Sequence, residues 1–133
     1  MTKRGREAIE KAEAYLRTSR SALDEKDAHP AVLNMFPACE YVANVLREYM
    51  GDKPSVRHEA KLEGAKRAYL KGLITNEEYK AYERVYQLKP LVQYDPYDSV
   101  HKTKKLKIKI DIEEAEELFQ AIESLVGKSK KYA

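Results

Sequence analysis

The sequence has only one cysteine, Cys39, and no long uninterrupted run of apolar residues. A single thiol cannot form an internal disulfide bond, and a structural zinc site normally takes four ligands. No apolar run approaches the roughly 18 residues that a membrane-spanning helix needs, and the basic start of the chain leads into charged residues instead of a signal-peptide core. We therefore expect a cytoplasmic protein without a disulfide, a zinc centre or a membrane segment.

Glycine and histidine are also few, and their positions exclude two further kinds of site. The five glycines are scattered, so none belongs to a glycine-rich phosphate loop. The three histidines, His29, His58 and His101, are too far apart in sequence to form a paired metal motif. Cys39 falls on the apolar face of an expected helix, where a thiol packs as a small apolar group. We expect no metal, no cofactor and no cysteine nucleophile.

Charged residues, in contrast, are frequent, which together with few glycines and prolines is typical of a helical protein. Of the 133 residues, 35% are charged and 43% are hydrophobic, with 5 Gly and 5 Pro. A chain of this length usually forms one compact domain. We therefore expect residues 1–133 to be a single helical domain.

The positive charge is concentrated in two short segments. Residues 101–109 contain five lysines and no acidic residue, and residues 128–133 contain three more lysines. Without these eight lysines, 17 basic residues face 22 acidic ones, so the rest of the chain has a formal charge of about −5. This segregation favours an anionic partner at residues 101–109, although a solvated lysine-rich arm has the same composition.

Apolar residues recur every three or four positions in five segments, which predicts an all-α, up-and-down bundle of four to five helices. The second segment is apolar around more than half of its circumference, so we expect it to be the central helix. In the third, Val56 and Leu70 are expected to face inward. The predicted helices cover residues 2–24, 30–50, 55–71, 75–89 and 112–127.

Two local signals predict where the fourth helix begins and ends. Thr75 and Glu78 have the spacing of a capping box, in which each side chain accepts a hydrogen bond from the other residue's backbone. Pro90 should end the helix near Lys89, because proline disfavours helical geometry in the residue before it.

One long irregular stretch, residues 89–110, separates the fourth helix from the last. Connections of this length are uncommon in a compact domain and are often functional. Its final run KLKIKI alternates lysine with Leu106, Ile108 and Ile110, a pattern that is typical of a strand with one apolar face. This run could pair with its copy across a dimer, pack as a strap over the bundle, or begin the last helix. Residues 128–133 are expected to form a flexible tail.

The order of these elements and a few residues resemble a known family. Tyr94, Asp95 and Pro96 follow Lys89 before the last helix, which contains the run EEAEEL. Over residues 5–126 the sequence is similar to the HEPN family, the higher eukaryotes and prokaryotes nucleotide-binding domains. The resemblance implies a HEPN-like homodimer that binds RNA or a nucleotide and pairs with a nucleotidyltransferase as one half of a toxin-antitoxin pair.

The chain departs from the ribonuclease branch of this family at the catalytic pair. Members of that branch use an arginine and, a few residues later, a histidine, and the resemblance places Lys89 and Tyr94 at these positions. Lysine keeps the positive charge but lacks the planar guanidinium fork, and tyrosine, with an ordinary pKa of about 10, is a poor base at neutral pH. The ribonuclease motif is therefore degenerate.

Three functional interpretations follow. The first is a HEPN-like protein that binds RNA or a nucleotide. The second is a helical adaptor or structural protein that binds a protein partner without catalysis. The third is a metal-independent ribonuclease in which the fold brings His101 to Lys89 and Tyr94. The residues expected to contact RNA or a nucleotide are Lys89, Tyr94, Asp95, Tyr97, Lys102, Lys104 and Lys105.

Overall fold

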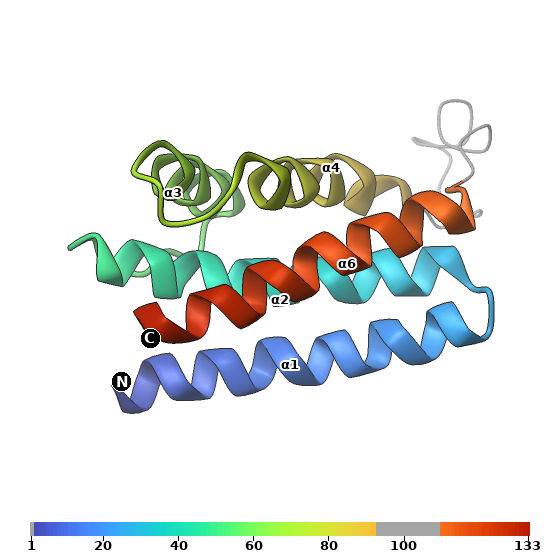
Figure 1. The fold of residues 1–133 in the computed structure, drawn as a ribbon, viewed down its shortest axis with the longest axis horizontal. Coiled ribbons are helices and arrows are strands. Elements are labelled where there is room, and N and C mark those ends of the chain that lie inside the picture. Colours follow the sequence, from blue (N-terminus) through green and yellow to red (C-terminus); the bar gives the residue numbers. More distant parts are fainter. Residues whose placement is uncertain (1, 93–109) are drawn as a thin grey trace.

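A computed structural model of the chain describes residues 2–92 and 110–133, and these residues form five α-helices and one turn of 3-10 helix (Figure 1). The all-α bundle predicted from apolar periodicity is thereby confirmed. None of these helices is both long enough and apolar enough to cross a membrane. The elements are α1 (Lys3–Asp24), α2 (Ala28–Tyr49), α3 (His58–Leu70), α4 (Asn76–Val92), α6 (Ile112–Ser129) and η1 (Lys130–Tyr132).

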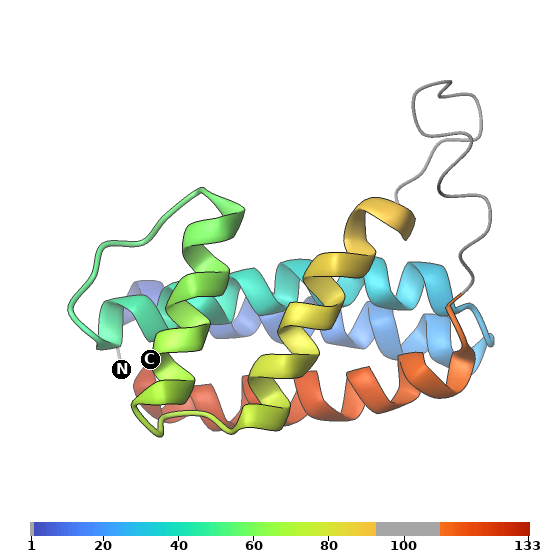
Figure 2. The same cartoon turned by 90° about the horizontal axis from the view of Figure 1, so that it is seen from above.

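Helices α1, α2 and α6 run along the length of the molecule, whereas α3 and α4 lie across α2 (Figures 1 and 2). Helix α1 is antiparallel to both α2 and α6, so the two chain ends meet at the same end of the bundle. There the backbone N–H of Thr2 donates to the carbonyl oxygen of Ala133 at 3.0 Å.

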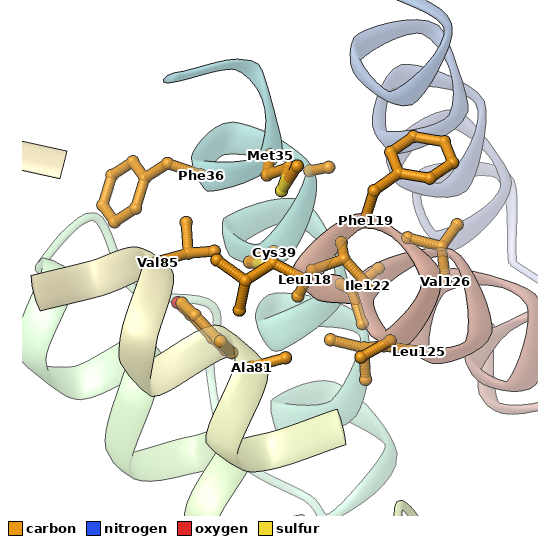
Figure 3. Close-up of a cluster of buried hydrophobic side chains, with 14 of the residues drawn as sticks. Met35, Phe36, Cys39, Ala81, Val85, Leu118, Phe119, Ile122, Leu125 and Val126 are labelled. Carbon is orange, nitrogen blue, oxygen red and sulfur yellow. The ribbon is translucent and has the colours of Figure 1, made fainter. Parts of the chain in front are cut away.

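Helix α2 is the central helix, as its apolar circumference predicted. Half of its 22 residues are buried, and it contacts α1, α3, α4 and α6. Figure 3 shows Met35 and Cys39 of α2 meeting Val85 of α4 and Ile122 of α6 in one apolar cluster. This cluster joins the lengthwise helices to the crossing ones.

The predicted capping box at the start of α4 is confirmed. The backbone N–H of Thr75 donates to the Glu78 carboxylate at 2.7 Å, and the backbone N–H of Glu78 donates to the Thr75 hydroxyl at 3.1 Å. Glu78 is itself buried, and it also accepts hydrogen bonds from the Ser124 hydroxyl at 2.7 Å and from Lys128 at 3.2 Å. The capping residue of α4 therefore also ties that helix to α6.

The predicted end of α4 at Lys89 is wrong by three residues, because the helix continues through Pro90 to Val92. A proline inside a helix removes one hydrogen bond to the carbonyl four residues earlier and crowds it. So close to the end of the helix, this disturbs only the last turn and does not stop it. Val92 is the last described residue before residues 93–109.

The predicted start of α3 and two of its inward positions are also wrong. The helix begins at His58, and Val56 is 91% exposed in the preceding loop, while Leu70 is 68% exposed. The loop is held by Asn44, whose side chain donates to the Ser55 carbonyl at 3.0 Å and accepts from the Ser55 N–H at 2.9 Å. These two hydrogen bonds hold the backbone of Ser55 in a non-helical conformation.

The tail that we expected to be flexible, residues 128–133, instead continues the fold. Helix α6 runs through Gly127 to Ser129, and η1 follows it directly. The Tyr132 hydroxyl donates to the Leu73 carbonyl at 2.9 Å, and the Tyr132 ring packs 4.7 Å from the ring of Tyr49. A C-terminal aromatic ring with a polar tip holds this segment against the bundle. Of the KLKIKI run, only Ile110 lies within the described residues, and it is buried.

We predict that Leu125→Ala lowers the free energy of unfolding by about 2–5 kcal/mol, because it empties a site that is fully buried in the apolar cluster. Leu70→Ala is the matched control, since it removes the same atoms from an exposed position and should change the stability by no more than about 0.5 kcal/mol. Urea unfolding followed by circular dichroism measures both. Equal losses in the two variants would contradict the assignment of the core.

We predict that Glu78→Gln destabilises the protein at neutral pH by about 1–3 kcal/mol. Burial alone would raise the pKa of Glu78, but the hydrogen bonds from Thr75, Ser124 and Lys128 outweigh it and lower the pKa below the ordinary value of 4.5. The stabilisation by the carboxylate is therefore complete above pH 4.5 and is lost as the pH falls through the lowered pKa.

The difference in unfolding free energy between wild type and Glu78→Gln should accordingly shrink in acid. The control is Glu77→Gln, which removes the same charge from an exposed neighbour in the same helical turn. A Glu78→Gln deficit that does not change with pH would show that the carboxylate charge is not what stabilises the fold.

Candidate functional site

Three helices bring charged and aromatic side chains together at one edge of the bundle. The first residue of α3 and the last turn of α4 lie at the same edge, above α2 (Figure 2). The α2 residues beneath them are separated by one helical turn and point to the same side. We call the following group the edge cluster: Phe36, Glu40, His58, Lys61 and Lys89.

Phe36 joins the two crossing helices at this edge. The Lys89 ammonium lies 4.9 Å from the centroid of the Phe36 ring, and the His58 ring packs edge-on against that ring at 5.3 Å. A cation over an aromatic face and an edge-to-face ring pair are both attractive. Since both groups contact one ring, Lys89 and His58 lie within about 10 Å of each other.

Glu40 is the anion of the edge cluster. Its carboxylate lies 2.5 Å from Nδ1 of His58 and 3.5 Å from Nζ of Lys61, and only 13% of its side chain is exposed. An ionised carboxylate only accepts hydrogen bonds, so Nδ1 of His58 donates and Nε2 is left for other partners. Two lysines share the cluster with one carboxylate, so its net charge is positive even when His58 is neutral.

A hollow of about 340 Å³ opens beside Lys89 between α1, α2 and α4. Pro37 of α2 lies in its wall, and a proline there supplies no N–H for the carbonyl oxygen of Leu33 four residues earlier. The hollow therefore combines aromatic surface and a cation. It is lined by Tyr15, Leu33, Asn34, Phe36, Pro37 and Lys89.

Of the site residues predicted from sequence, Lys89 is the one within the described part of the chain. It lies in the last turn of α4 and belongs to the edge cluster. The other predicted site residues lie outside the described residues, so their roles stay predictions. They are Tyr94, Asp95, Tyr97, His101, Lys102, Lys104 and Lys105.

The pairing of His58 with Glu40 is a feature that the sequence did not reveal. The two residues are 18 positions apart and meet only because α3 packs on α2. The spacing of His58 and Lys61 does place them on one helical face, which was a usable signal for a basic group. No local sequence pattern links His58 or Lys61 to Glu40.

Cys39 packs in the core, as predicted from its place on an apolar helical face. It is completely buried, and the loss of solvation raises the pKa of its thiol well above the ordinary value. A protonated, enclosed thiol is a poor nucleophile. In residues 2–92 and 110–133, no group of three or more histidine, cysteine or acidic side chains is placed to hold a metal ion.

No protein-family model matches the sequence, and the curated proteins contain no match to it either. The HEPN resemblance therefore stays a prediction. The edge cluster has to be interpreted from its own geometry.

We predict that Cys39 is protected from thiol reagents in the folded protein. Reaction with a chromogenic disulfide reagent at mildly alkaline pH should be slow in buffer and immediate in concentrated urea, because only unfolding exposes the thiol and restores its ordinary acidity. The Cys39→Ser variant, which has no thiol, gives the background signal of the reagent. Rapid stoichiometric labelling of the folded protein would show that the thiol is accessible and would contradict its assignment to the core.

Proposed function

We propose that this protein binds RNA or a nucleotide at the edge cluster, as a HEPN-like protein with a degenerate ribonuclease motif. The observation that carries the proposal is the placement of the Lys89 ammonium over the Phe36 ring, within about 10 Å of His58 and in the wall of a hollow. Cations next to aromatic surface suit a ligand that has both phosphates and bases.

The distribution of charge along the chain supports the same location. The five lysines of residues 101–109 follow α4 in sequence, and α4 ends at Val92, three residues after Lys89. Without these five lysines, 20 basic residues face 22 acidic ones in the rest of the chain, so an anionic ligand is favoured at the lysine-rich segment that follows α4.

Binding without cleavage fits the residues that the chain has in place of the family's catalytic pair. Lys89 lies on the Phe36 ring, where a lysine provides a point charge for a phosphate and no bidentate fork. The same proposal includes a cytoplasmic location for this protein. It also includes a homodimer and a nucleotidyltransferase partner in a toxin-antitoxin pair, which the HEPN resemblance implies. A helical adaptor that binds a protein partner is the rival function.

We predict that the purified protein binds a labelled RNA oligonucleotide with an affinity that falls steeply between 50 and 200 mM salt, measured by fluorescence anisotropy. Lys89→Gln should weaken binding and reduce the slope of log affinity against log salt by about 0.7, the value for one lost contact to a single strand. Lys102, Lys104 and Lys105 changed together to Glu should weaken binding further. Glu40→Gln should strengthen it, because the edge cluster then loses its only carboxylate.

Lys80→Gln is the matched control for Lys89→Gln. Lys80 also lies near an aromatic ring, 5.9 Å from the centroid of Tyr79, but in the first turns of α4, nine residues before Lys89. It should leave RNA binding unchanged. Absence of binding at low salt, or binding that is insensitive to Lys89→Gln and to the triple change, would reject RNA binding at this edge and favour the adaptor.

A further inference from the structure

The hollow beside Lys89 is one end of a longer groove along α1 and α2. It shares Tyr15 and Pro37 with a second hollow of about 210 Å³, which shares Tyr41 and Asn44 with a third of about 270 Å³. Hollows that share wall residues adjoin one another. No residue of α6 lines any of the three in the described part of the chain, so the groove lies on the face of the α1 and α2 pair that α6 leaves uncovered.

The walls of this groove are one face of each helix. Residues that recur three or four positions apart share a helical face, and both walls have that spacing. On α2 the wall extends from Leu33 to Glu48, a length of about 22 Å at 1.5 Å per residue. From α1 the wall residues are Arg4, Glu7, Ala8, Lys11 and Tyr15, and from α2 they include Asn34, Pro37, Tyr41, Asn44 and Glu48.

The size of the groove indicates an extended ligand. Pockets for compact small molecules usually enclose about 300–1,000 Å³. Each of the three hollows is near or below the lower end of this range, yet together they extend over four turns of α2. This shape fits a chain of repeating units that places one unit in each hollow.

Two tyrosines form an aromatic surface at the middle of the groove. The rings of Tyr15 and Tyr41 lie 6.1 Å apart with an angle of 24° between their planes, and Tyr15 is 37% exposed. The Lys11 ammonium lies 5.8 Å from the centroid of the Tyr41 ring, and Lys89 lies in the wall on the other side of Tyr15. The aromatic surface is therefore flanked by a cation on each side.

The acidic residues of the groove are mostly paired with its own cations. Glu48 accepts from Arg4 at 2.6 Å, and Glu40 binds Lys61 and His58. Glu7 is the further acid in the wall, and it lies in the third hollow, away from Lys89. The stretch from Lys89 to Lys11 thus offers cations and aromatic rings to an incoming ligand.

We infer that the α1 and α2 groove binds unpaired nucleic acid, with bases stacked on Tyr15 and Tyr41 and phosphates near Lys11 and Lys89. This inference rests on the proposed function and adds the form of nucleic acid that the site selects. Aromatic side chains stack on bases that are free of a duplex, whereas paired bases are covered on both faces by their neighbours. The protein should therefore bind a single strand in preference to a double helix of the same sequence.

The test compares a labelled 12-nucleotide RNA with the same RNA annealed to its complement, by fluorescence anisotropy in one buffer. We expect wild type to bind the single strand at least tenfold more tightly. Tyr15→Ala and Tyr41→Ala should each weaken single-strand binding by about fivefold to a hundredfold, the range for loss of one stacked base. Duplex binding should stay unchanged, because it depends on the lysines alone.

Conservative and distant variants control for damage to the fold. Tyr15→Phe keeps the ring and should bind as wild type. Tyr69→Ala, which removes one ring of a stacked tyrosine pair that lines none of the three hollows, should also bind as wild type. Equal affinity for single strand and duplex, or no effect of Tyr15→Ala and Tyr41→Ala, would overturn the inference and leave RNA binding at the edge cluster standing. Failure of wild type to bind either form would overturn both.

Sedimentation of the same variants tests one other explanation, namely that the groove is an interface between two copies of the chain. If Tyr15→Ala and Tyr41→Ala convert a wild-type dimer into a monomer and leave single-strand binding unchanged, the groove is an interface between two copies of the chain and the inference is wrong. If the variants keep the mass of the wild type and lose single-strand binding, the inference is supported.

Discussion

The need to cover most of the circumference of helix α2 is the constraint from which the rest of this structure follows. An ordinary surface helix buries one stripe, whereas α2 has apolar residues around most of its circumference. No single neighbour can cover such a helix. Helices α1 and α6 therefore lie along it, and α3 and α4 lie across the side that remains (Figure 2). The edge cluster is a consequence of this arrangement, because crossing helices place their ends beside the central one.

Polar contacts fix the positions of the surrounding helices relative to α2 and to one another. Ser19 of α1 donates to the carbonyl of Ala31 at 2.8 Å, which fixes the start of α2 against α1. Arg20 binds the Glu116 carboxylate with two nitrogens, at 2.6 and 3.1 Å, which fixes α1 against α6. Apolar packing alone tolerates small shifts along a helix axis, whereas these directional bonds do not. At the edge cluster, the hydrogen bond between His58 and Glu40 fixes the start of α3 against α2 in the same way.

The sequence predicted the parts of the fold that depend on local chemistry. The helices over α1 and α2 and the capping box at Thr75 were predicted because apolar spacing and capping residues act within one or two turns. The errors at Val56 and at the C-terminal segment have tertiary causes, since Asn44 holds Ser55 out of the helix and Tyr132 packs on Tyr49. The extension of α4 through Pro90 reflects how little one late proline costs a helix.

The residues of the candidate site also divide into those marked by local sequence and those brought together only by tertiary packing. Lys89 could be singled out from its place before Pro90 and the tyrosine-rich stretch, but its contact with Phe36 depends on how α4 crosses α2. Glu40 and His58 carry no pattern that joins them in the sequence, and Tyr15 lies on the polar face of an amphipathic helix, where a single tyrosine is unremarkable. Sequence reasoning missed the residues whose roles depend on contacts with a neighbouring helix.

The meeting of the two chain ends has a practical consequence for the architecture. Thr2 and Ala133 are joined by a backbone hydrogen bond, while the chain leaves α4 at Val92 and enters α6 near Ile110 toward the other end of the bundle (Figure 1). A short peptide could therefore link the ends without crossing the core, and new ends could be opened between Val92 and Ile110. Such a circular permutant would keep whole each helix in the described part of the chain.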